Sequence, residues 1–187
     1  MKNATTTATA AAKSRTHWLT LTAMMTAVTC VLAPFSLTIG PVPISLTNLV
    51  IYFSLYLLGW KRATVSYLVY LFIGLVGLPV FSGFTGGLAK LAGPTGGYII
   101  GFIPMAILAG VIMEHTENKA LHFLGMILGT AICYAFGTAW YCVVMNSPMI
   151  TALGACVFPF IPGDIVKMLA AVLVCPTIQK RLATVRG

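Results

Sequence analysis

Two charged side chains stand inside an apolar segment near the end of the chain, and they are the residues best suited to hold a polar ligand. Asp164 and Lys167 fall within a predicted helix of residues 162–177. Their i, i+3 spacing places both on one face, where they can pair. A carboxylate and an ammonium together supply acceptors and donors for a small polar head group. The pair is therefore the first candidate for a binding site.

A purely structural role is the alternative for this pair, in which the two charges neutralise each other and tie the helix end to a loop. We favour a ligand site, because ionisable groups in membrane-spanning segments are costly and usually functional. Asp164 is also expected to open its helix, directly after Pro162 and Gly163. The positive end of the helix dipole favours a carboxylate there.

A second candidate is the glycine-rich connection of residues 77–98, which carries six glycines between Gly83 and Gly97. Glycine permits tight turns and close approach of the backbone to a ligand. Phe81, Phe84 and Tyr98 could supply an apolar wall with one hydroxyl. With few polar residues to keep it solvated, this connection is predicted to form a packed lid rather than a flexible loop.

Other kinds of chemistry have little support in the sequence. The chain has three acidic residues and no nucleophile–base set or zinc-protease motif, so an intramembrane enzyme is a weak choice and no cofactor or metal is expected. The five cysteines lie in or beside apolar runs without metal-ligand spacing and are predicted to pack as small apolar residues. The net charge of +8 is spread in small groups, which argues against nucleic-acid binding.

The composition requires a lipid environment. Hydrophobic residues make up 59% of the 187 positions and charged residues 7%, whereas a soluble domain carries about a quarter charged residues. The sequence therefore predicts an all-α integral membrane protein. Six apolar segments are expected to be transmembrane helices, at residues 18–37, 45–60, 63–78, 97–113, 120–145 and 162–177.

Basic residues give the predicted topology. Nine of the eleven lie before the first segment, in alternate connections, or after the sixth segment. Positively charged connections stay in the cytoplasm, so both termini are predicted to be cytoplasmic. The three outer connections are longer and almost uncharged, and we expect them to fold back as caps over a ligand cavity. Residues 1–16 are interpreted as a disordered cytoplasmic tail and residues 17–187 as one domain, with the first helix retained rather than cleaved.

Helix packing is predicted from small residues. Gly125, Gly129, Cys133 and Gly137 recur every four residues, which gives the fifth segment a smooth stripe for close contact within the bundle. Ala23 and Ala27 form a similar pair on the first segment. No internal repeat is evident, which weakens a reading as a secondary transporter.

Four spaced motifs resemble the BioY family, the biotin-binding S components of energy-coupling factor (ECF) transporters. They begin at Gly40 (GPVPISLT), Gly77 (GLPVFSG), Gly93 (GPTGGY) and Phe160 (FIPGDIVK). The likeness runs in order along nearly the whole chain after the tail. It implies a six-helix protein that captures biotin from outside and is energised by a transmembrane coupling protein and two ATPase subunits. Such a protein belongs in the bacterial cytoplasmic membrane.

The resemblance also implies residue roles. It gives Asp164, Lys167 and Tyr98 as polar ligand contacts, with the ureido N–H groups of biotin facing the carboxylate and its carbonyl facing the ammonium. Phe81 is a candidate for the apolar wall. Asn48 and Lys90 are guesses for the donor to the biotin carboxylate. The family often has Gln in the second-helix motif where this chain has Thr47 and Asn48, so contacts from that helix are less defined.

Partners and alternatives follow from the same resemblance. Ala23 and Ala27 resemble the family's surface for docking the coupling protein. The sequence leaves open whether the chain forms homo-oligomers and whether it works without the ECF module. The alternatives are an S component for another vitamin, such as thiamine or riboflavin, and a membrane assembly subunit that binds no ligand.

Overall fold

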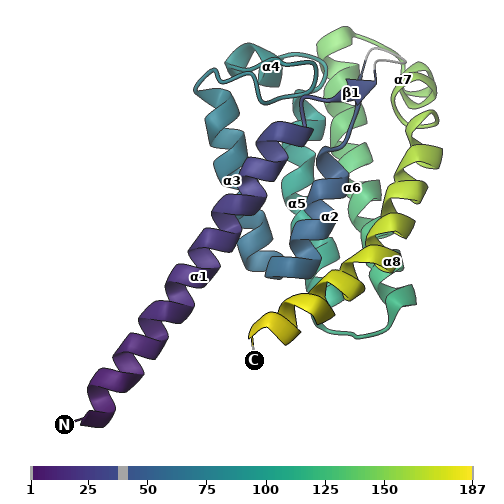
Figure 1. The fold of residues 1–187 in the computed structure, drawn as a ribbon. Coiled ribbons are helices and arrows are strands. Elements are labelled where there is room, and N and C mark those ends of the chain that lie inside the picture. The colour runs from purple at the N-terminus through teal and green to yellow at the C-terminus, as the bar shows by residue number, and fades with distance from the viewer. Residues whose placement is uncertain (1, 38–41, 187) are drawn as a thin grey trace.

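The computed structural model describes the backbone of residues 2–37 and 42–186 and the side chains of residues 15–37 and 42–181. These residues form eight helices and one pair of short strands, arranged as a helical bundle (Figure 1). In chain order the elements are α1 (Lys2–Leu32), β1 (Ser36–Leu37), β2 (Ile44–Ser45), α2 (Thr47–Leu58), α3 (Trp60–Leu75), α4 (Leu88–Ala92), α5 (Gly96–Glu114), α6 (Lys119–Met145), α7 (Met149–Cys156) and α8 (Phe160–Arg186).

Each of the six predicted apolar segments contains a helix, namely α1, α2, α3, α5, α6 and α8. By length and composition, α5, α6 and the Phe160–Arg181 part of α8 are long and apolar enough to cross a membrane. Helices α2 and α3 have 12 and 16 residues, below the ~20 that a perpendicular span needs. The outer connections add α4, α7 and the antiparallel pair β1–β2, which the sequence did not predict.

Two predicted helix ends are wrong. Helix α1 ends at Leu32 rather than near residue 37, because Pro34 disfavours helical backbone before it and lacks an N–H. Helix α8 begins at Phe160, so Asp164 lies one turn inside the helix rather than at its opening. No acidic residue falls in the first turn of α8. The argument from the helix dipole therefore carries little weight for Asp164.

The N-terminal region also differs from the prediction. Residues 1–16 were expected to be a disordered tail, but α1 begins at Lys2 and its backbone runs without a break into the first apolar segment. Alanine, which favours helix more than any other residue, is frequent there. Residue 1 lies outside the described residues, and so do residues 38–41, which hold the Gly-Pro start of the first motif.

The two ends of the bundle differ in charge. One end of the bundle holds the α2–α3 junction with Lys61 and Arg62 and the α5–α6 connection before Lys119 (Figure 1). The start of α1 and the end of α8 lie toward the same end. The strands, α4 and α7 lie at the opposite end. This segregation agrees with the charge pattern from which the topology was predicted.

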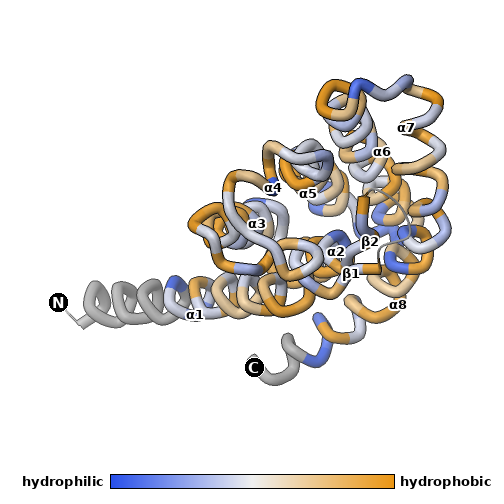
Figure 2. The backbone as a smooth tube through the Cα atoms, turned by 90° about the horizontal axis from the view of Figure 1, so that it is seen from above, coloured by the Kyte–Doolittle hydropathy of each residue, from blue (hydrophilic) through white to orange (hydrophobic). Residues whose placement is uncertain are grey.

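Large apolar side chains cover the outside of the bundle. Phe72 on α3, Val143 on α6 and Leu173 on α8 are each more than 60% exposed. Figure 2 shows hydrophobic positions along the outer helices and hydrophilic ones where α2, β2 and α8 meet. Soluble proteins rarely expose so much contiguous apolar surface. The exterior therefore fits lipid, while polar groups gather inside the bundle.

The glycine stripe of α6 packs against α5, as predicted. A Cβ atom on Gly129 would lie 2.9 Å from the Met105 carbonyl oxygen, and one on Gly137 would lie 2.3 Å from the ring of Tyr98. Only a residue without a side chain allows this approach. The stripe thus fixes the position of α5, and with it the ring of Tyr98.

Candidate functional site

The predicted pair on α8 is present and mostly buried. Lys167 Nζ lies 3.1 Å from Asp164 Oδ1, and the two side chains are 12% and 9% exposed. The i, i+3 spacing on one helix face accounts for this contact. A buried ion pair needs further hydrogen bonds to offset its desolvation. The neighbouring helices supply them.

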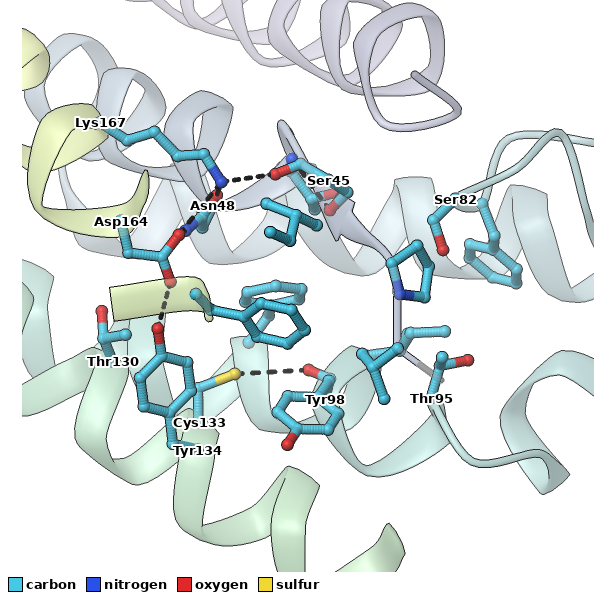
Figure 3. Close-up of a pocket in the computed structure, with 18 of the residues that line it drawn as sticks. Ser45, Asn48, Ser82, Thr95, Tyr98, Thr130, Cys133, Tyr134, Asp164 and Lys167 are labelled. Carbon is cyan, nitrogen blue, oxygen red and sulfur yellow. Dashed lines mark hydrogen bonds and ion pairs between the residues drawn. The ribbon is translucent and has the colours of Figure 1, made fainter. Parts of the chain in front are cut away.

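Asn48 from α2 and Tyr134 from α6 complete the group around the carboxylate (Figure 3). Asn48 donates through Nδ2 to Asp164 Oδ1 at 2.7 Å, and the Tyr134 hydroxyl donates to Oδ2 at 2.5 Å. Asn48 Oδ1 also accepts from Lys167 Nζ at 3.0 Å. Three helices that are far apart in the sequence thus meet at one charged centre, which we call the polar cluster: Asn48, Tyr134, Asp164 and Lys167.

The strand β2 adds one backbone acceptor to the polar cluster. The Ser45 carbonyl oxygen accepts from Lys167 Nζ at 2.7 Å. All three donors of the ammonium therefore have protein partners: Ser45, Asn48 and Asp164. A ligand carbonyl that binds Lys167 must replace one of them. The Asp164 carboxylate accepts three hydrogen bonds and keeps room for a further donor.

The polar cluster forms one end of a cavity between the helices and the outer segments. Aromatic and aliphatic side chains form much of the rest of its wall: Val42, Ile44, Phe81, Ile99, Phe102 and Phe160. Phe81 is 1% exposed, and its ring lies against Gly74, where a Cβ atom would be 2.2 Å from the ring. The cavity can therefore take a molecule with a polar head and an apolar body.

The glycine-rich connection closes part of this cavity, as the predicted lid should. Gly83 N–H donates to the Pro34 carbonyl at 3.0 Å, and Gly87 N–H donates to that of Gly74 at 2.7 Å. Gly83 and Gly87 have φ of 76° and 86°, a conformation that favours glycine. These contacts hold the connection to α3 and to the segment that follows α1.

The glycines near α5 serve packing rather than approach to a ligand. A Cβ atom on Gly96 would lie 1.7 Å from the Leu91 carbonyl oxygen, and one on Gly97 would lie 2.2 Å from Trp140 Cβ. The glycine pair in GPTGGY is thus required by close contact with α4 and α6. The glycines were predicted to allow close approach to a ligand, but at these two positions the close neighbour is the protein itself.

Tyr98 and Phe81 both line the cavity, but Tyr98 lines it in an unexpected manner. The Tyr98 hydroxyl lies 3.3 Å from Thr138 Oγ1 and donates to the Cys156 carbonyl at the same distance. Its polar group is therefore held by α6 and α7, and the ring is what remains for a ligand. A role for Tyr98 as a wall residue fits this geometry better than a role as a polar contact.

Two residues named from the sequence do not reach the cavity. Lys90 lies on α4 and is not among the lining residues. Its partial burial lowers the pKa of its ammonium. Phe84 is 60% exposed, with φ of 55°, and its ring packs edge-on against Phe35. Asn48 does line the cavity. It belongs to the polar cluster, however, and does not form a separate site for the biotin carboxylate, as the sequence had suggested.

The family model for BioY matches residues 2–184. This chain belongs to the BioY family. The BioY assignment agrees with the four motifs found in the sequence. It is supported further by individual relatives and by a solved structure.

Two BioY relatives illustrate the extent of the likeness. The chain is 36% identical over 161 residues to the probable biotin transporter BioY of Pyrococcus horikoshii, covering 86% of this chain and 95% of the relative. It is 35% identical over 160 residues to the biotin transporter BioY of Thermotoga maritima, covering 84% and 92%. Both matches span most of each protein.

A solved structure shares the fold. The crystal structure of the S-component for biotin from an ECF-type ABC transporter superposes with a TM-score of 0.81 at 31% identity. The match covers 90% of this chain and 93% of the other. The multi-pass helical fold of BioY proteins is therefore that of the chain described here.

Several lining residues of this BioY protein were missed by the sequence. They are Ser45, Tyr67, Tyr70, Ser82, Thr95, Thr130, Cys133 and Tyr134. One usable signal was the spacing on α6, where Thr130 and Tyr134 are four residues apart and so share a face next to Cys133 of the glycine stripe. A hydroxyl in an apolar span requires a partner, and that requirement could have marked Tyr134. Ser82 and Thr95 carry no such signal.

The docking prediction for this BioY protein concerns an exposed face of α1. Ala23 and Ala27 are exposed, whereas Thr26 faces α3 and its Oγ1 lies 2.9 Å from Ser66 Oγ. The alanine pair therefore lies on a part of the α1 surface that the bundle leaves exposed.

Proposed function

We propose that this protein binds biotin at the outer end of the bundle and serves as the substrate-binding S component of an ECF-type transporter. One observation carries the proposal: a buried carboxylate and ammonium, fixed by Asn48 and Tyr134, stand at one end of a largely aromatic cavity. Biotin has a matching distribution of groups, with a polar ureido head on an apolar bicycle.

The polar cluster would bind the ureido ring through hydrogen bonds. The two ureido N–H groups are donors, and the Asp164 carboxylate retains acceptor capacity beside the Tyr134 bond. The ureido carbonyl is an acceptor and would replace one protein partner of the Lys167 ammonium. Because donors and acceptors alternate across the ring, a carboxylate beside an ammonium is complementary to it. A hydrogen bond that involves a charged group is stronger than a neutral one.

The apolar wall would hold the thiophane ring and the aliphatic tail. Phe81 and the ring of Tyr98 are buried in this wall. Burial of apolar surface stabilises the complex by about 25 cal/mol per Å². The aromatic lining therefore supplies affinity, and the polar cluster supplies selection for the ureido group.

The transport role comes with further inferences. We infer six membrane spans with both termini in the cytoplasm, residues 17–187 as one domain, and residence in the cytoplasmic membrane of a bacterium. Ala23 and Ala27 would dock a transmembrane coupling protein that is energised by two ATPase subunits. The exposure of this alanine pair on α1 supports the docking role. No catalytic role is proposed for the chain.

Equilibrium binding of radiolabelled biotin to the purified full-length chain in detergent tests the proposal. We expect saturable binding that excess unlabelled biotin displaces and that thiamine and riboflavin leave intact. Displacement by either of those vitamins would assign the site to another substrate. Copurification with an ATPase module without binding of any vitamin would instead indicate an assembly subunit.

A further inference from the structure

A second polar region lies across the cavity from the polar cluster. Ser82 and Thr95 both line the cavity, and Figure 3 shows them on the side away from Asp164 and Lys167. Apolar wall residues stand between the two regions. The cavity is therefore polar at both ends, charged at one and hydroxylic at the other.

The Thr95 hydroxyl has no hydrogen-bond partner within the part of the chain that the structure describes. Thr95 is only 7% exposed. A buried polar group without a partner is costly, and nearly all such groups in folded proteins are paired. Thr95 Oγ1 can therefore donate a hydrogen bond to a group that enters the cavity.

The position of Thr95 favours an anion as that group. Thr95 is the N-cap of α5, a helix of 19 residues, yet its side chain makes no capping bond to the helix. Threonine at this position ordinarily caps the first turn through its oxygen. Because the hydroxyl is not used for capping, it can donate outward, and the positive end of the helix dipole lies beside it.

Ser82 adds a second hydroxyl from a different segment. Its Oγ makes no hydrogen bond with any other described residue, although Thr85 Oγ1 donates to its backbone carbonyl. Ser82 is half-buried and follows the buried Phe81 in the glycine-rich connection. The lid and the start of α5 therefore each contribute one hydroxyl donor on this side of the cavity.

We propose that Thr95, at the N-terminus of α5, and Ser82, in the glycine-rich connection, form the subsite for the carboxylate of the ligand's aliphatic tail. This inference rests on the proposed binding of biotin. It replaces Lys90, which does not line the cavity, as the candidate donor to that carboxylate. The ligand then spans the cavity, with its ureido head on the polar cluster and its tail carboxylate on the two hydroxyls.

The test compares biotin with biotinol, which has a primary alcohol in place of the carboxylate. We expect Thr95→Val to weaken biotin binding by about tenfold, since a hydrogen bond to a charged group is lost. Biotinol affinity should change less than about twofold, since its neutral end gains little from this donor. Thr95→Ser keeps the hydroxyl and should retain both affinities. Ser82→Ala should likewise weaken binding of biotin more than binding of biotinol. Because this substitution removes only a hydroxyl group, it disturbs the packing less.

The outcomes separate the two proposals. Equal losses of affinity for biotin and biotinol in Thr95→Val would overturn the carboxylate subsite. Unchanged biotin affinity in both Thr95→Val and Ser82→Ala would overturn it as well. Neither result would contradict the proposal that the protein binds biotin. Absence of biotin binding by the wild-type chain would overturn both. Asp164→Asn provides the matched comparison, because it should weaken both ligands alike through their shared ureido ring.

Discussion

The Tyr134 hydroxyl on α6 donates a 2.5 Å hydrogen bond to Oδ2 of Asp164 on α8. The other carboxylate oxygen accepts from Asn48 on α2 and from Lys167. One acid thus ties three helices together. Its charge is balanced by a single ammonium, which is itself fully coordinated by protein groups. A site arranged in this way is preorganised, so ligand binding costs little free energy for ordering its side chains.

Replacement of Asp164 by Asn should weaken biotin binding by about 10- to 100-fold, the cost of losing hydrogen bonds to a charged group. Asn has nearly the same shape but removes the charge that balances Lys167. Equilibrium binding of labelled biotin measures the effect. Elution as a single peak in size-exclusion chromatography controls for folding, and an unchanged affinity would remove Asp164 from the site.

Tyr134→Phe should weaken biotin binding by about tenfold, because the carboxylate loses the donor that fixes Oδ2. Tyr141→Phe is the matched control. Tyr141 lies on the same helix and is buried, but it does not line the cavity and makes no hydrogen bond with other described residues. Isothermal titration of both variants measures the difference, and equal affinities would contradict the positioning role of Tyr134.

The sequence predicted the local parts of this site and missed those that depend on distant contacts. The pairing of Asp164 with Lys167 follows from i, i+3 spacing within one helix, and the structure confirms it. The contact between Asn48 and Asp164 joins residues 116 positions apart. No local pattern encodes such a contact, so Asn48 was expected near the carboxylate of the ligand instead.

In the fold, too, the sequence predicted the local features and missed those that depend on distant contacts. Apolar runs located a helix in each of six segments, because burial in lipid imposes a length and a composition. The short elements α4, α7 and β1–β2 were missed, since an apolar run of a few residues fits a helix, a strand or a loop equally well. Their conformation is set by contacts with the bundle, such as the hydrogen bond from Gly83 to Pro34.

Gly137→Ala should destabilise the protein and weaken biotin binding together. Its added methyl group would lie 2.3 Å from the Tyr98 ring, which lines the cavity. Overpacking of this kind costs about 1–3 kcal/mol. Thermal unfolding in detergent, followed with and without biotin, measures both effects.

Gly154→Ala is the control for that substitution. Gly154 lies on α7, and among the described residues no atom outside its own stretch of helix backbone lies within 4 Å of the position that its Cβ atom would take. The unfolding temperature of the Gly154→Ala variant should match that of the wild type or rise slightly, since alanine favours helix. If both variants unfold at the wild-type temperature, the contact between Gly137 and Tyr98 does not constrain the cavity.

The double variant Ala23→Leu, Ala27→Leu should bind biotin normally but fail to copurify with the coupling protein and its ATPases. Both alanines are exposed on α1, so larger side chains would project from the bundle surface and prevent close approach of a partner helix. Ala131→Leu, Ala135→Leu is the matched control, because this pair has the same spacing and is exposed on α6. Affinity purification of the coexpressed complex, with labelled biotin binding measured on each variant, gives both readouts. Equal copurification of the two double variants would place the docking surface elsewhere on the bundle.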